Sequence, residues 1–184
     1  YDNQLNLNLK KLFNSINRKI SLIIIANPNS PTGTIIDKVN MYKILIKAKS
    51  HDVPVLIDEA YQGFCNQTYI NDLKKFNNLI ILRTFSKSCG LAGLRAGYLV
   101  SNEKIINELD KFKPMYEINS AACKVLEILL KKKNFEKKIV NHVLDGKKYF
   151  QNELDKMNLK YLKTFGNFLH VDLGKKKNMI EQKL

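Results

Sequence analysis

The sequence is poor in cysteine, histidine and arginine, with three residues of each. Cys65, Cys89 and Cys123 share no C-x-x-C spacing and the histidines are scattered singly, which argues against a disulfide framework or a zinc site. No apolar run approaches the length of a membrane span, and the first residues lack a charged-then-apolar leader. We therefore expect a cytoplasmic protein with reduced thiols, no metal and no membrane partner.

Positive charge is abundant, but almost all of it comes from lysine. The chain has 31 Lys+Arg against 17 Asp+Glu, which gives a formal net charge of +14, and its only arginines are Arg18, Arg83 and Arg95. The lysines are spread along the chain, whereas specific readers of nucleic acid rely more on arginine. We interpret the excess as solvated helix faces and expect no nucleic-acid partner.

The first hundred residues alternate between strand-like and helix-like patterns. Strands are predicted at 20–26, 53–57, 79–82 and 96–100, and helices at 38–50 and 70–75. The first run is continuously apolar and rich in β-branched residues, so we expect a strand buried on both faces. Asp37 is placed to cap the helix that follows it. This alternation predicts an α/β fold with a doubly wound sheet.

The remaining residues are mainly helical by pattern. Helices are predicted at 103–111, 119–131 and 135–157, followed by short strands at 159–162 and 167–173. The third of these helices is long enough to lead from one domain to another. We predict part of a large domain in residues 1–125, and a connecting helix with an incomplete small domain in residues 126–184. The chain thus has the organisation of a fragment.

One stretch combines several groups that bind phosphate or react with carbonyl compounds. It begins where the predicted strand 79–82 ends, and it contains the hydroxyls of Thr84 and Ser86, the amine of Lys87 and the guanidinium of Arg95. Ligands of open α/β sheets bind at the carboxyl ends of strands, and two glycines in the stretch permit close backbone approach. The combination suits a phosphorylated cofactor, with Lys87 as its covalent anchor.

Two further motifs also follow predicted strands. Asp58 follows the strand 53–57, which places its carboxylate at the carboxyl end of that strand, and Tyr61 follows in the next turn. The turn 27–33 contains two prolines and is compatible with a cis peptide bond. The segment 55–59 also looks like the magnesium-binding strand of a nucleotide hydrolase, but the chain has no G-x-x-x-x-G-K-[ST] loop, which disfavours that alternative.

These stretches, NPNSPTG at 27–33, DEAY at 58–61 and TFSKSCGLAGLR at 84–95, resemble the signatures of pyridoxal-phosphate (PLP) enzymes of fold type I, in the aminotransferase class that includes histidinol-phosphate aminotransferase. The resemblance implies a large PLP-binding domain with three layers and a mostly parallel sheet, and the beginning of a small C-terminal domain. It implies that Lys87 holds PLP covalently, that Asp58 pairs with the ring nitrogen, and that Ser86 and Arg95 hold the phosphate. Thr84 is a secondary candidate for the phosphate.

The resemblance is least complete at the turn 27–33. Many family members place a second asparagine immediately before P-T-G, and its amide binds the phenolic oxygen of the cofactor, which the tyrosine at the position of Tyr61 also reaches. This chain has Ser30 at that position, so either Ser30 substitutes or Asn29 supplies the amide. A hydroxyl donates one hydrogen bond but reaches less far than an amide.

The implied activity is transfer of an amino group from an amino acid to a 2-oxo acid or a phosphate-bearing carbonyl compound. The partners would be a small-molecule amino donor and a carbonyl acceptor, and the complete protein would be a homodimer. A PLP-dependent decarboxylase of the threonine-phosphate type is one alternative, because this class also resembles those enzymes. A non-catalytic aminotransferase-like binding or regulatory module is another.

Overall fold

The computed structural model describes residues 2, 5 and 7–183. Its centre is a four-stranded sheet in the order β1 (Ile23–Ala26), β2 (Val55–Asp58), β3 (Leu79–Thr84) and β4 (Gly97–Val100). The first three strands are parallel and β4 is antiparallel to β3. The predicted α/β class with a mostly parallel sheet is confirmed.

The main hydrophobic core lies between the sheet and helix α2 (Lys38–Lys49), with helix α1 (Leu9–Ser15) packed beside it. Strand residues at alternate positions, such as Ile23, Ile25, Val55 and Ile57, are buried in this core with apolar residues of α2. Alternation places them on one face of the sheet, so α1 and α2 form a helical layer over that face. The resemblance implied three layers, with helices on both faces of the sheet. Within the described residues, no second helical layer covers the other face of β1.

The prediction of a first strand buried on both faces at 20–26 was wrong. The strand begins at Ile23, and its burial alternates, with Ile24 67% exposed. The physical reason is that α1 and α2 cover the face to which Ile23 and Ile25 point, whereas the other face of β1 has no described element over it. A continuous apolar run in the sequence predicts a strand, but it does not show whether other elements cover one face of that strand or both.

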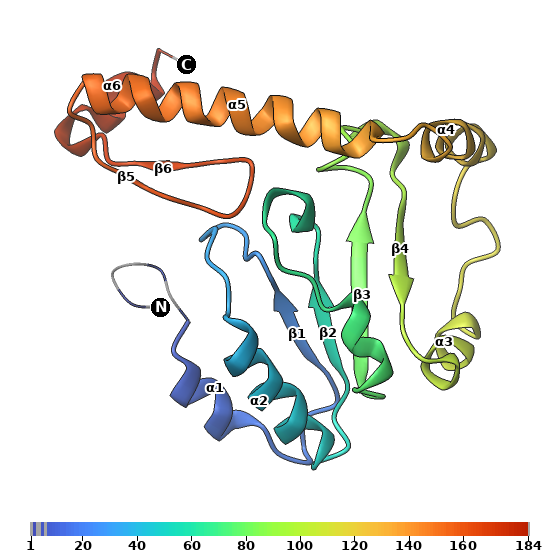
Figure 1. Ribbon diagram of the computed structural model, residues 1–184. Coiled ribbons are helices and arrows are strands. Elements are labelled where there is room, and N and C mark those ends of the chain that lie inside the picture. The colour runs from blue at the N-terminus through green and yellow to red at the C-terminus, as the bar shows by residue number, and fades with distance from the viewer. Residues whose placement is uncertain (1, 3–4, 6, 184) are drawn as a thin grey trace.

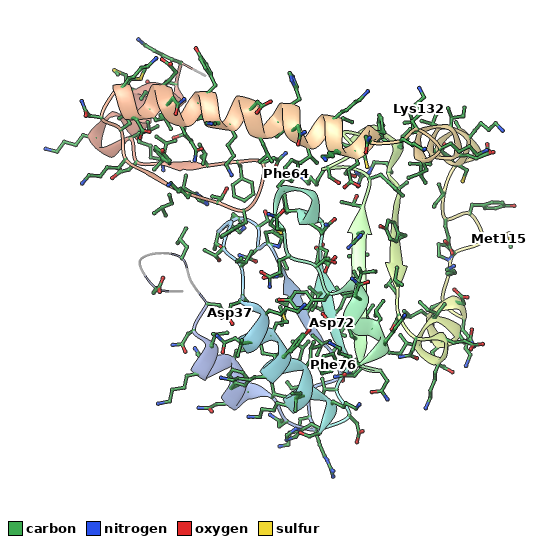
Figure 2. All side chains as sticks on the ribbon, viewed as in Figure 1. Asp37, Phe64, Asp72, Phe76, Met115 and Lys132 are labelled. Carbon is green, nitrogen blue, oxygen red and sulfur yellow. The ribbon has the colours of Figure 1, made fainter. Side chains whose placement is uncertain are left out.

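Asp37 caps α2, as predicted. Its Oδ1 accepts a hydrogen bond of 3.0 Å from the backbone N–H of Asn40, and Figure 2 shows its side chain at the start of the helix. This bond, with a second from the Asn40 side chain, lowers the pKa of the Asp37 carboxyl below its ordinary value. The ionised carboxylate is therefore the form that stabilises the helix.

Replacing Asp37 by alanine is expected to lower the free energy of unfolding by about 1 kcal/mol at neutral pH. Asp37→Asn is the matched control, because asparagine caps nearly as well as aspartate. Since the folded-state pKa of Asp37 is lowered, the ionic part of its stabilisation is present above the unfolded-state pKa and is lost as the pH falls through the folded-state pKa. Urea titrations at several pH values measure both effects, and equal stability of Asp37→Ala and Asp37→Asn at neutral pH would contradict the cap.

After β4, the regular elements are helices apart from one hairpin. The regular elements are α3 (Glu103–Asp110), α4 (Ser120–Leu130), α5 (Phe135–Lys156), α6 (Lys177–Glu181) and the antiparallel pair β5 (Tyr161–Leu162) and β6 (His170–Val171). Short 3-10 helices are η1 (Gln62–Phe64), η2 (Ile70–Lys74), η3 (Ala92–Leu94) and η4 (Gly174–Lys176). Helix α5 crosses the end of the sheet at which β1, β2 and β3 terminate (Figure 1).

The predicted helices match these elements to within a few residues, except that 70–75 forms the 3-10 helix η2. The strands predicted at 159–162 and 167–173 are each reduced to two residues, because the hairpin between them is mostly loop. Among the described residues, no helix combines the length and the apolar character that crossing a membrane requires.

Candidate functional site

Three segments with polar side chains meet at the carboxyl end of the sheet. Because β1, β2 and β3 are parallel and in register, the turn after β1, the residues after β2 and the lysine stretch after β3 emerge at one edge. Figure 1 shows these strand ends beneath α5. The edge therefore gathers residues that are far apart in the sequence.

A groove of about 280 Å³ lies at this edge. Four of the predicted cofactor-binding residues line it, namely Asp58, Thr84, Ser86 and Arg95. They come from β2, from β3 and from the two ends of the lysine stretch. The volume is near the lower end of the range of about 300–1,000 Å³ for small-molecule sites.

Local hydrogen bonds fix the backbone around the groove. Thr84 Oγ1 accepts from the N–H of Ser86 at 3.1 Å and bonds the carbonyl of Ala96 at 3.3 Å, which holds the two ends of the lysine stretch together. Asp58 Oδ1 accepts from the N–H of Ala60 at 2.9 Å, so the carboxylate is oriented by its own turn. Arg95 has a left-handed backbone with φ 53°, and its side chain is exposed. The groove thus offers an oriented acid, two hydroxyls and a guanidinium.

Lys87 lies beside the groove rather than among its lining residues. Its Nζ is 5.2 Å from the centroid of the Tyr61 ring, in a cation–π contact, and the side chain is exposed. The Tyr61 ring in turn meets the ring of Phe168 edge-to-face at 5.6 Å between centroids. The structure therefore pairs the predicted anchor lysine with the predicted tyrosine and leaves the amine accessible.

The turn after β1 presents its two candidates differently. Asn29 Nδ2 donates to Thr32 Oγ1 at 2.6 Å, so this amide helps to hold the turn itself. Ser30 is exposed. The Asn27–Pro28 and Ser30–Pro31 peptide bonds are both cis, in keeping with the sequence-based expectation of a turn compatible with a cis bond. Neither Asn29 nor Ser30 lines the groove.

Two residues near the edge were not identified from the sequence as site residues. Asn27 is 1% exposed; its Oδ1 accepts from the N–H of Ile36 at 2.7 Å, and its Nδ2 is buried without a hydrogen-bond partner in the described part of the chain. Phe168 reaches Tyr61 from the loop between β5 and β6. No local pattern indicates this contact, since it joins segments that are distant in the chain.

A buried ion pair between Arg83 and Glu59 links β3 to the residue that follows β2. The Glu59 carboxylate, with 0% of its side chain exposed, accepts from Arg83 Nη2 at 2.8 Å and from the N–H of Tyr69 at 2.6 Å. Thr68 Oγ1 donates to the same carboxylate at 2.9 Å. Arg83 thus neutralises the buried acid that adjoins Asp58 in the sequence.

Cys89 lies inside the lysine stretch but is not placed for nucleophilic chemistry. Burial, and then the negative charge of Glu136, raise the pKa of its thiol, so the reactive thiolate is disfavoured. In residues 2, 5 and 7–183, no cluster of three or more His, Cys, Asp or Glu side chains is arranged to hold a metal ion. The reactive groups that remain at this edge are the amine of Lys87 and the side chains that line the groove.

The fold and this edge define an α/β protein with a basic, hydroxyl-rich groove at the carboxyl end of a mostly parallel sheet. The chain belongs to the aminotransferase class I and II family, whose family model matches residues 1–184. This agrees with the resemblance found in the three sequence motifs.

Individual relatives point to the same family. The chain is 38% identical over 170 residues to histidinol-phosphate aminotransferase of Clostridium novyi (strain NT), an alignment that covers 91% of this chain and 47% of the relative. The crystal structure of the histidinol-phosphate aminotransferase from Clostridium acetobutylicum superposes with a TM-score of 0.85 at 22% identity, over 99% of this chain and 58% of that one.

The histidinol-phosphate aminotransferase from Sinorhizobium meliloti, solved in complex with pyridoxal-5'-phosphate, superposes with a TM-score of 0.81 at 22% identity, over 98% of this chain and 50% of that one. At these identities the structural likeness shows the fold. The chain spans about half the length of the curated relatives that it matches.

Proposed function

We propose that the chain forms part of a PLP-dependent aminotransferase, which moves an amino group from an amino acid to a 2-oxo acid or a phosphate-bearing carbonyl compound. The observation that carries this proposal is the convergence of Asp58, Ser86 and Arg95 on one groove beside the exposed amine of Lys87. The named histidinol-phosphate aminotransferases among the relatives favour an acceptor or donor that carries a phosphate group.

The residues of the groove fit PLP chemically. When bound, PLP supplies an aldehyde that reacts with primary amines and a pyridine ring that withdraws electrons from the substrate Cα. The guanidinium of Arg95 and the hydroxyls of Ser86 and Thr84 suit a phosphate dianion. The carboxylate of Asp58 suits a protonated ring nitrogen, whose positive charge it would stabilise.

Each residue then has a distinct task. Lys87 would hold the cofactor through its Nζ, and the freed amine would accept the proton from the substrate Cα and deliver it to the cofactor carbon that the amine had held. Tyr61 would donate a hydrogen bond to the phenolic oxygen of the cofactor. Ser30 is the better second donor, because its side chain is exposed, whereas one N–H of the Asn29 amide bonds Thr32 and holds that side chain within its own turn.

We also propose that the chain divides into part of a large domain and a connecting helix with an incomplete small domain, the division expected from the sequence at residue 125. The separate sheets, β1 to β4 in one part and β5 with β6 in the other, support it. A boundary at residue 125 would cut helix α4, so we place the physical break in the turn at 131–134.

We propose that the complete protein is a cytoplasmic homodimer. The dimer is supported by the apolar segment between α3 and α4, in which the side chains of Phe112, Met115 and Tyr116 are 84%, 85% and 88% exposed. Figure 2 shows Met115 pointing away from the rest of the chain. Side chains of this kind gain free energy when a further protein surface covers them.

Product analysis tests the proposed reaction. The protein that contains this sequence is incubated with PLP, a 2-oxo acid acceptor and a panel of amino acids, including phosphate-bearing amines, each labelled at the carboxyl carbon where it has one. An aminotransferase yields the carbonyl form of the donor with any carboxyl label retained. Release of labelled carbon dioxide with an amine product would instead support the decarboxylase alternative. No product from any donor, together with salt-dependent retention on nucleic acid, would support the binding-module alternative.

A further inference from the structure

Lys147 is a half-buried lysine that the proposed chemistry does not use. It lies on α5, and its Nζ donates to the carbonyl oxygens of Thr164 and Gly166 at 2.7 Å each and to Thr164 Oγ1 at 3.0 Å. An ammonium group has three N–H donors, so all of them are used on one loop. No ion pair with a carboxylate is found for it within the described residues, and burial lowers its pKa.

The loop that Lys147 holds connects β5 to β6 and lies against the turn after β1. The N–H of Phe165 donates to the Gly33 carbonyl at 2.7 Å, and a ring nitrogen of His170 lies 2.6 Å from the Pro31 carbonyl oxygen. A Cβ on Gly33 would lie 2.2 Å from the Thr164 Cβ, so the two segments are in close contact. Thr164 Oγ1 also donates to the Phe168 carbonyl.

The same loop reaches the anchor lysine through two aromatic contacts. Phe168 packs edge-to-face on Tyr61, and Tyr61 lies under Lys87 Nζ. Helix α5 meets this region at its other end too, because a Cβ on Gly63 of η1 would approach Val140 of α5 at 3.1 Å and Ser88, the neighbour of Lys87, at 2.5 Å. Figure 2 shows Phe64 of η1 directly beneath α5.

We infer that Lys147 is a positioning residue for the candidate site: it fastens the β5–β6 loop to α5, so that Phe168 and the Gly33 contact hold Tyr61 and the turn 27–33 in place. A charged lysine suits this task, because hydrogen bonds from a charged donor to carbonyl oxygens are stronger than neutral ones. The part of the inference that concerns the cofactor rests on the proposed function, whereas the fastening of the loop does not.

Hydrogen exchange of the protein without cofactor tests the fastening. Lys147→Met keeps a long apolar stem but removes the three donors, and exchange at the Phe165 amide is expected to become about tenfold faster, with smaller increases over the turn 27–33. Lys148→Met is the matched control on the same helix, because Lys148 is exposed, and it is expected to leave these rates unchanged. Lys147→Arg, which keeps the charge and donors, is expected to restore most of the protection.

Equal exchange at Phe165 in Lys147→Met and Lys148→Met would overturn the inference. Faster exchange throughout β2 and β3 in Lys147→Met would mean that the substitution destabilises the whole fold. In that case Thr164→Val is the deciding variant, because it removes only the hydroxyl between Lys147 and Phe168. Faster exchange confined to the loop then supports the fastening, and unchanged exchange overturns it.

Cofactor binding tests the link to the site separately. Lys147→Met is expected to bind PLP about fivefold more weakly than Lys148→Met, because Tyr61 is less well positioned before binding. A faster-exchanging loop with unchanged PLP affinity would overturn the positioning role. Failure of the wild type itself to bind PLP would overturn the proposed function, whereas the exchange result on the loop would still stand.

Discussion

Replacing Lys87 by alanine is expected to slow amino transfer by roughly 10²- to 10⁴-fold, the contribution typical of a positioned acid–base group. Alanine removes the amine that would both hold the cofactor and move the proton at Cα, and with it the cation–π contact with Tyr61. The measurement is the rate of carbonyl product formation from the best donor with PLP in excess. Lys104→Ala, at an exposed lysine of α3, is the control and is expected to react at the wild-type rate.

Lys87→Arg tests whether the site needs the amine of Lys87 or only its positive charge. Arginine retains a cation that can contact the Tyr61 ring, but its guanidinium does not deprotonate in proteins and is a poor nucleophile. We therefore expect Lys87→Arg to lose as much activity as Lys87→Ala. Substantial activity in Lys87→Arg would mean that Lys87 contributes only positive charge, and the assigned mechanism would be wrong.

Replacing Arg83 by alanine is expected to lower the free energy of unfolding by about 3–5 kcal/mol, the usual cost of leaving a buried charge without its partner. The Glu59 side chain is fully buried and the Arg83 side chain is 19% exposed, so water cannot readily take the place of the guanidinium. Because Glu59 adjoins Asp58 and pairs with the strand that leads into the lysine stretch, this ion pair also supports the site. Equilibrium unfolding in urea measures the effect.

Two further variants show whether burial is the cause. Lys111→Ala breaks the exposed pair with Glu108 and is expected to cost at most about 1 kcal/mol. Adding Glu59→Gln to Arg83→Ala removes the uncompensated charge and is expected to recover part of the loss. Losses of similar size in Arg83→Ala and Lys111→Ala would contradict the importance that we assign to the buried pair.

The sequence was sufficient where local chemistry decides the structure. β2 and β3 are apolar runs that end in polar turns, and parallel pairing then brings Asp58, Thr84 and Ser86 to one edge without any further information. Asp37 was identifiable as a cap because capping depends on a few neighbouring residues. The motifs that follow β2 and β3 therefore supply residues of the groove, whereas the turn after β1 supplies none.

Tertiary packing decides the features that were missed. The exposure of Ile24 depends on which elements cover the sheet, and the contacts of Phe168 with Tyr61 and of Lys147 with Thr164 depend on how α5 places a distant hairpin. The engagement of the Asn29 amide with Thr32 depends on the conformation of their turn. No periodicity or spacing in the sequence reports such contacts.

Covalent trapping tests the central claim most directly. The protein that contains this sequence is treated with PLP and then borohydride, digested, and mapped by mass spectrometry across its lysines; of the 31 Lys+Arg in this chain three are arginines, so 28 lysines compete for the label. The account predicts one predominant adduct, at Lys87, which an added amino donor suppresses when it precedes the borohydride. Label spread over exposed lysines, with no preference for Lys87, would contradict it.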